Sequence, residues 1–188
     1  MKIIAFRRSV GAPVTIPPEI DIMPDSAMTV ANRPLFLPDF APEWEGVVAP
    51  AFRISRLGKE IGRKYASRYY DAVTLALRIS PVGIPCSDSA VMKAFDSCIT
   101  LGPWQPLPSA DNKSLEDASY DIKWQNLSTI LTNGELCINE AIEAVSHYCT
   151  FKTGDVVIPL ELRPALALRP DATFTASING AEFTVKIK

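Results

Sequence analysis

The sequence predicts a strand-rich α+β protein built around a curved antiparallel sheet. Sixteen prolines against nine glycines disfavour long helices wherever the prolines cluster, because an interior proline breaks a helix. Short runs of alternating apolar and polar residues recur along the chain, as half-buried strands require. The C-terminus carries a hairpin signal, Asn179-Gly180, between two such runs. Strands therefore outweigh helices.

The first 50 residues hold eight of the sixteen prolines. Such a stretch favours extended chain, short strands and turns over helix. The total of 188 residues suits one domain. We therefore expect a single domain over residues 1–188, with residues 1–50 forming a proline-rich extended arm packed on it.

Two segments have helical spacing. Lys59–Tyr69 carries Ile61, Tyr65 and Tyr69 at four-residue steps. A second helix is predicted from Asn139, as its N-cap, to about Cys149. His147 lies on the face opposite its apolar stripe, so we interpret it as a surface residue rather than a catalytic base.

Each strand is predicted from the alternation of apolar and polar residues within a short segment. Val73, Leu75 and Leu77 alternate with residues that form a mixed face. At the C-terminus, ATFTASI and AEFTVKIK flank the Asn179-Gly180 turn, and alternation places Phe183 and its neighbours on one buried face. The polar stretch SADNKSLEDAS, after a second proline cluster, is predicted to be a surface loop.

Composition excludes several function classes. Apolar residues make up 47% and charged residues 21%, with a net charge of −2, so we expect no nucleic-acid partner and no membrane contact. A single histidine excludes sites that need two imidazoles. The four cysteines form no C-x-x-C pair, and each is interpreted as a small buried apolar residue. With no signal-peptide pattern, the sequence predicts a cytoplasmic protein.

Six blocks stand out along the chain: PDSAM (24–28), RPLFLPDF (33–40), RISRLGKEI (53–61), RYYDAVTL (68–75), KAFDSCITLG (93–102) and FKTGDVV (151–157). In this order and spacing they together resemble the fumarylacetoacetate hydrolase family, in its small bacterial acylpyruvate hydrolase-like branch. The resemblance spans nearly the whole chain and implies a mixed β-roll with flanking helices, usually dimeric. It also implies hydrolysis, decarboxylation or isomerisation of β-keto acids with Mg²⁺ or Mn²⁺.

The resemblance also implies three metal carboxylates, a Glu-x-Glu pair and an Asp. Anchored on the neighbouring blocks, these positions hold Val47, Ala49 and Arg78. None of these side chains offers an oxygen ligand to a hard divalent cation. We therefore expect no metal cofactor, unless a two-residue slip brings in Glu43 and Glu45 or another acid such as Glu161 takes over.

Other family features have changed as well. The substrate-contacting G-x-N-Y stretch of the family reads FRRSV here, and its Thr-Gly-Thr-Pro loop reads PLELRP. Lys93 alone matches a family active-site residue, and it is the one remnant candidate for catalysis, with Asp96 beside it. The altered positions carry a positive charge at Arg78, which Lys93 would increase unless Asp96 or Glu45 pairs with it.

Two outcomes follow for the cleft. Either Arg78 forms an internal ion pair with Glu45, Asp96 or Asp71, or the cleft attracts an anion through Arg78 and Lys93. The leading hypothesis is a catalytically inactive, metal-free homologue that acts as a structural or interaction protein, as a homodimer or with a paralogue. The alternatives are a binder of small carboxylates, and an active hydrolase, isomerase or decarboxylase of acylpyruvates or β-keto acids with a rearranged site.

Overall fold

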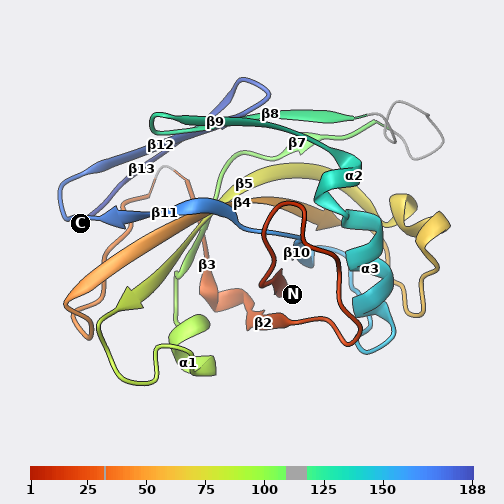
Figure 1. Cartoon of the computed structure of the whole chain (residues 1–188), viewed down its shortest axis with the longest axis horizontal. Coiled ribbons are helices and arrows are strands. Elements are labelled where there is room, and N and C mark those ends of the chain that lie inside the picture. Colours follow the sequence, from red (N-terminus) through yellow and green to blue (C-terminus); the bar gives the residue numbers. More distant parts are fainter. Residues whose placement is uncertain (32, 109–117) are drawn as a thin grey trace.

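A computed structural model describes residues 1–31, 33–108 and 118–188 of the chain. In these ranges one nine-stranded sheet runs in the order β2-β1-β10-β4-β5-β6-β3, with β11 paired to β4 and β7 to β5. A four-stranded sheet has the order β13-β12-β8-β9. The chain is therefore strand-rich α+β with a curled sheet, as the sequence predicts (Figure 1).

The strands of the larger sheet are β1 (Lys2–Phe6), β2 (Ile20–Pro24), β3 (Met28–Val30), β4 (Glu43–Ile54), β5 (Tyr70–Val82), β6 (Ile99–Leu101), β7 (Gln105–Pro106), β10 (Val156–Ile158) and β11 (Leu162–Leu168). Those of the smaller sheet are β8 (Ser119–Trp124), β9 (Leu127–Thr132), β12 (Thr173–Ile178) and β13 (Ala181–Lys186). The helices are α1 (Ala90–Lys93), α2 (Asn133–Leu136) and α3 (Ile138–Ser146), and two 3₁₀ segments are η1 (Asp25–Ala27) and η2 (Arg63–Tyr69).

The long antiparallel pair β4–β5 is the centre of the molecule. The smaller sheet covers one face of this pair, and the ring of Phe52 on β4 meets that of Tyr120 on β8 with centroids 6.0 Å apart (Figure 1). The sequence predicts one apolar and one mixed face for β5, and both faces are buried, Thr74 and Arg78 on the mixed face included. The alternation could not show that a second layer covers the mixed face.

Pro50 lies in the middle of β4, although proline cannot donate a hydrogen bond to a sheet ladder. β11 pairs with β4 only as far as Val48, and β10 pairs with it from Phe52. Pro50 therefore falls in the gap between these two partners, where no donor is required. The first 54 residues thus supply β1 to β4, and no α-helix forms among the described residues of this stretch.

The helix predictions are partly confirmed. α3 forms and His147, just after it, is exposed, but the helix begins at Ile138 and its N-cap is Cys137 rather than Asn139. The predicted helix Lys59–Tyr69 is only the 3₁₀ segment η2. Glu60 is at positive φ (52°) and Gly62 is extended (ψ 142°), so the backbone is not helical before residue 63. The N–H groups of residues 60 and 61 donate to the carbonyl and hydroxyl of Ser146.

The C-terminal hairpin is confirmed in register and facing. β12 pairs with β13 around Asn179-Gly180, both at positive φ, and Phe183 and Val185 are buried. The predicted loop SADNKSLEDAS lies mostly outside the described residues. No helix among the described residues has the length and hydropathy needed to cross a bilayer.

Candidate functional site

The three positions that the resemblance assigns to metal ligands come together on the central strand pair. Val47 on β4 lies directly opposite Arg78 on β5, and Ala49 lies two residues further along β4, on the same face as Val47. All three residues are buried. The three positions therefore lie close together, and the only charged group among them is the guanidinium of Arg78.

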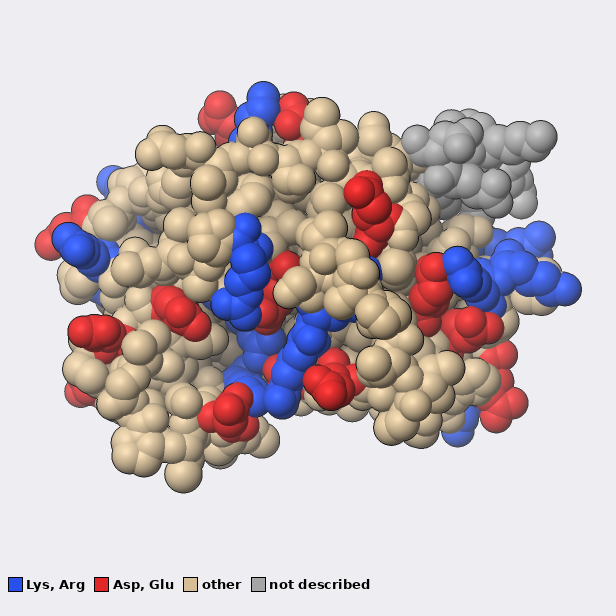
Figure 2. All heavy atoms as spheres, viewed as in Figure 1, with Lys and Arg blue, Asp and Glu red and all other residues tan. Residues whose placement is uncertain are grey.

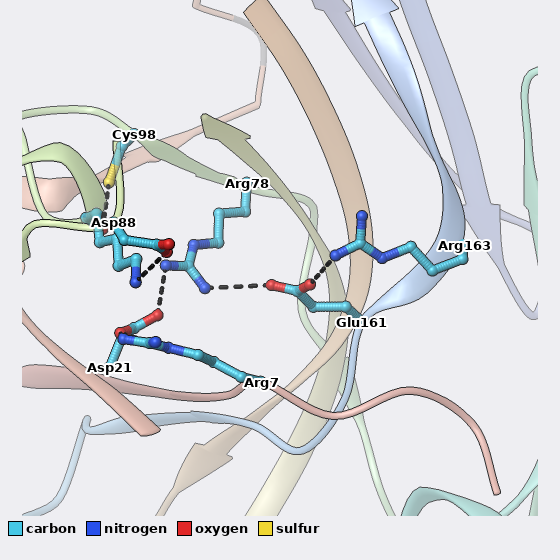
Figure 3. Close-up of polar contacts among 8 residues, drawn as sticks. Arg7, Asp21, Arg78, Asp88, Cys98, Glu161 and Arg163 are labelled. Carbon is cyan, nitrogen blue, oxygen red and sulfur yellow. Dashed lines mark hydrogen bonds and ion pairs between the residues drawn. The ribbon is translucent and has the colours of Figure 1, made fainter. Parts of the chain in front are cut away.

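Arg78 is held by two acids from distant parts of the chain (Figure 3). Its Nη2 donates to Oδ2 of Asp21 at 2.7 Å, and its Nη1 donates to Oε1 of Glu161 at 3.2 Å. Asp21 comes from β2, and Glu161 immediately precedes β11. The Arg78 side chain is only 7% exposed, so each of these hydrogen bonds is charge-assisted and shielded from water.

Two further arginines extend the network at its ends. Arg7, just after β1, donates Nε to Oδ1 of Asp21 at 3.0 Å, and its Nη2 contacts the same oxygen. Arg163 on β11 donates Nη2 to Oε2 of Glu161 at 3.0 Å. Arg7, Asp21, Arg78, Glu161 and Arg163 thus form one alternating chain of charges, called the arginine network below.

The arginine network controls the ionisation of Asp21. Burial opposes the charged form and is the largest single influence on this carboxyl group. The hydrogen bonds and charges of Arg7 and Arg78 together outweigh burial, so the pKa of Asp21 lies below its ordinary value. Hydrogen bonding to Asp21 likewise raises the pKa of Arg7. Asp21 is therefore ionised at neutral pH and neutralises Arg78.

The partners that the sequence suggests for Arg78 were wrong. Asp71 instead pairs with Arg53 on the surface, at 2.8 Å. Glu45 lines the same cleft as Arg78 but forms no ion pair within the described part of the chain. Asp96 is exposed and does not line the cleft. Alternation and spacing could not identify Asp21, which lies 57 positions from Arg78.

Lys93, at the end of α1, also faces the cleft, and its charged partner is Asp88 rather than Asp96 or Glu45. The Nζ atom lies 2.8 Å from Oδ1 of Asp88, without the alignment of a hydrogen bond. The Lys93 side chain is 13% exposed, whereas that of Asp88 is 94% exposed. Lys93 is thus a buried ammonium whose counter-charge is solvated.

The donor set does not fit a divalent cation. The two nearest acids, Asp21 and Glu161, each bind two guanidinium groups, and Arg78 places a positive charge between them. No cluster of three or more His, Cys, Asp or Glu residues suited to a metal occurs in residues 1–31, 33–108 and 118–188. Glu43 and Glu45 lie opposite Val82 and Ser80 on β5, and their recruitment as ligands by a two-residue slip stays a prediction.

Together these side chains line one cleft of about 270 Å³ (Figure 2 shows basic and acidic groups gathered around a hollow). Its lining contains five cations and four carboxylates, which leaves one net positive charge. One of the cations, Arg8, donates only to neutral groups, including the carbonyls of Glu135, Leu136 and Pro159. The sequence stretch FRRSV, noted for its departure from the family, supplies both Arg7 and Arg8.

The thiol of Cys98 lies beside the site and donates to the carbonyl of Lys93 at 3.6 Å (Figure 3). Burial raises the pKa of Cys98 to about 11, so it stays protonated at pH 8. Cys86, which the sequence predicted to be buried, is exposed; Cys137 and Cys149 are half-buried, and all four thiols are free.

A thiol-specific reagent should separate these cysteines. Reaction of the native protein with Ellman's reagent at pH 8 is expected to label Cys86 first and Cys98 last, because the thiolate is the nucleophile. Cys86→Ser should remove the fast phase, while the matched Cys98→Ser variant should leave it unchanged. Loss of the fast phase in Cys98→Ser would contradict this assignment.

Comparison with known proteins finds relatives through structure alone. No family model matches the sequence, and no curated protein does. Fumarylpyruvate hydrolase from Pseudomonas aeruginosa, in complex with Mn²⁺ and pyruvate, superposes with a TM-score of 0.77 at 16% identity, over 100% of this chain and 89% of that one. Maleylpyruvate hydrolase from Sphingobium sp. SYK-6, in complex with manganese(II) and pyruvate, gives 0.78 at 18% identity, over 99% and 69%.

A third match extends the comparison to isomerases. The 5-carboxymethyl-2-hydroxymuconate delta-isomerase from Mycobacterium smegmatis gives a TM-score of 0.77 at 18% identity, covering 99% of this chain and 78% of that one. A proposed fumarylacetoacetate hydrolase family protein from Yersinia pestis CO92 gives 0.78 at 16% identity, over 100% and 92%. This chain therefore has the fold of fumarylacetoacetate hydrolase-family hydrolases and isomerases.

Proposed function

We propose that this protein is a metal-free member of the fumarylacetoacetate hydrolase family in which the arginine network has replaced the metal centre. It acts as a structural or interaction protein rather than as a metal-dependent hydrolase. The observation that carries the proposal is Arg78, whose guanidinium lies at a position that the resemblance assigns to a metal carboxylate and binds both nearby acids.

The electrostatics of the site support this proposal. A cation entering beside Arg78 would meet a fixed positive charge, and it could gain Asp21 or Glu161 only by breaking their ion pairs with arginines. Each of these pairs compensates the desolvation of a buried charge. Loss of those pairs would therefore offset much of what a carboxylate–metal contact contributes.

The expected surroundings of the protein belong to the same proposal. We propose that it works in the cytoplasm, paired with a second copy or with an active paralogue. The resemblance implies members that are usually dimeric, and this chain has the fold of such proteins, which supports the pairing. The ion pairs of the arginine network then have a structural purpose, since they hold β2, β5 and the start of β11 together.

Calorimetric titration with MnCl₂ and with MgCl₂ tests the proposal. No saturable binding is expected up to millimolar metal, because the carboxylates of the cleft are held by arginines. Turnover of fumarylpyruvate and maleylpyruvate should remain at background with or without Mn²⁺. The fumarylpyruvate hydrolase of Pseudomonas aeruginosa, assayed in parallel, is the positive control.

Two results would contradict the proposal. One is stoichiometric Mn²⁺ binding that Glu45→Gln or Glu161→Gln abolishes, which would show that a rearranged carboxylate set holds the ion. The other is substrate turnover that EDTA removes. Either result would favour the rival function, an active hydrolase or isomerase with a rearranged centre.

A further inference from the structure

Lys93 and Asp88 form an unequal pair. The ammonium of Lys93 is buried in the cleft wall, and its charged partner is Asp88, 2.8 Å away and poorly aligned for a hydrogen bond, while the Asp88 side chain is almost fully in water. A buried charge needs a well-placed partner to offset its desolvation. A carboxylate as exposed as that of Asp88 supplies little of this, because solvent screens its charge.

The same part of the cleft offers unused donors. The guanidinium of Arg7 donates from Nε and Nη2 to one oxygen of Asp21, and its Nη1 has no acceptor within the described part of the chain. Asp88 lines the same cleft as Arg7, and its negative charge contributes to the raised pKa of that arginine. The carboxylate of Asp88 thus lies within the field of two cations, Lys93 and Arg7.

The size and charge of the cleft restrict which ligand could replace the carboxylate of Asp88 beside Lys93 and Arg7. A volume of about 270 Å³ lies just below the usual range of ligand pockets, about 300–1,000 Å³, and favours a small ligand. The cleft has one net positive charge with Asp88 included. Moving the Asp88 side chain out of the cleft would leave two net positive charges. This movement requires little free energy, because that side chain is already solvated.

We propose that Asp88 is an internal stand-in for a small carboxylate ligand, which binds between Lys93 and Arg7 and displaces the Asp88 side chain. This inference rests on the proposed function, because it assigns the cleft an anion in place of a metal. Arg78 takes no direct part, since Asp21 and Glu161 already occupy its donors. Its role is to position Asp21, which in turn orients Arg7.

Calorimetric titration of the wild-type protein and of Asp88→Asn with malonate, pyruvate and inorganic phosphate tests the proposal. Asp88→Asn removes the carboxylate that competes with the ligand for Lys93 and Arg7. Malonate or pyruvate should therefore bind to this variant about tenfold more tightly than to wild type, which corresponds to one charge-assisted hydrogen bond. The neutral analogue malonamide should not bind to either protein.

Matched variants locate the site. Lys93→Gln and Arg7→Gln should each weaken carboxylate binding by about tenfold or more, since each removes a charged donor. Arg53→Gln is the control, because Arg53 is an arginine whose exposed pair with Asp71 lies outside the cleft lining; it should leave the affinity unchanged. Circular dichroism confirms that each variant is folded, and Arg7→Gln provides a second test should Lys93→Gln fail to fold.

The outcomes separate this inference from the proposed function. Absence of carboxylate binding to folded Asp88→Asn overturns the inference and leaves the metal-free proposal intact. Tighter binding of phosphate than of either carboxylate overturns the ligand class. Saturable Mn²⁺ binding to the wild-type protein contradicts the proposed function itself.

Discussion

Replacing Arg78 by methionine is expected to lower the free energy of unfolding by about 3 kcal/mol. Methionine retains much of the aliphatic stem but removes the guanidinium that joins Asp21 to Glu161. Breaking a buried ion pair by removing one partner typically costs about 3–5 kcal/mol. The lower end applies because Arg7 and Arg163 still neutralise the two acids.

Urea denaturation followed by circular dichroism measures this loss. Arg53→Gln is again the matched control, because its pair with Asp71 is about half exposed and such pairs contribute about 0–1 kcal/mol. If Arg78→Met lowers the free energy of unfolding no more than this control does, the arginine network does not stabilise the fold.

The pH dependence of stability gives a second measurement on the same pair of proteins. The pKa of Asp21 is lowered in the folded state, so its contribution is present above its unfolded pKa of about 3.9 and is lost as pH falls through the folded value. In Arg78→Met one of the influences that lower this pKa is gone. The stability that Asp21 loses on acidification should therefore be smaller in Arg78→Met, and the loss should be complete at a higher pH than in wild type.

Replacing Asp155 by asparagine is expected to have the larger effect, about 3–5 kcal/mol. Asp155 is completely buried and accepts hydrogen bonds from the backbone N–H groups of Lys2, at 2.9 Å, and Lys152, at 2.8 Å. It also pairs with the Lys2 ammonium. An asparagine can accept through only one oxygen, and its NH₂ group would face donors. The ammonium of Lys2 would keep its hydrogen bond to the carbonyl of Thr150 but lose its counter-charge.

Thermal and urea unfolding of Asp155→Asn and Lys2→Met measure this contribution. Lys2→Met should cost less, because the Lys2 side chain is 22% exposed and its loss leaves both backbone donors to Asp155 in place. Asp155 ties the start of β1 to the turn before β10, and Arg7 follows β1 directly. A loss below about 1 kcal/mol in Asp155→Asn, the scale of an ordinary hydrogen bond, would contradict this account.

Local patterns predicted the elements whose causes are local. The turn of the C-terminal hairpin depends on Asn179-Gly180, and the buried face follows from alternation within eight residues on each side. The segment 59–69 is not an α-helix: Glu60 is at positive φ and Gly62 is extended. The first residues of this segment bond to Ser146, a residue far along the chain that no local pattern involves. The prediction that Cys86 is buried was wrong for the same reason, since the exposure of a cysteine depends on tertiary contacts.

The candidate site divides in the same way. The blocks around β4 and β5 anchored residues 47, 49 and 78, and antiparallel pairing then placed Val47 opposite Arg78. The partners of Arg78 could not be predicted, because Asp21 reaches it from β2 and Glu161 from the start of β11. Likewise Lys93 meets Asp88, five positions away, through the short turn before α1.

Residue types and near neighbours are therefore enough to predict the strand-rich class and the hairpin. They also show that the three positions which the resemblance assigns to metal ligands carry no oxygen-donor side chain. The folded chain is needed to see that a buried arginine is neutralised by two distant acids and that a lysine faces the same cleft with a solvated partner. Charges pair across space, and the free energy of a pair depends on burial and distance, neither of which a one-dimensional pattern contains.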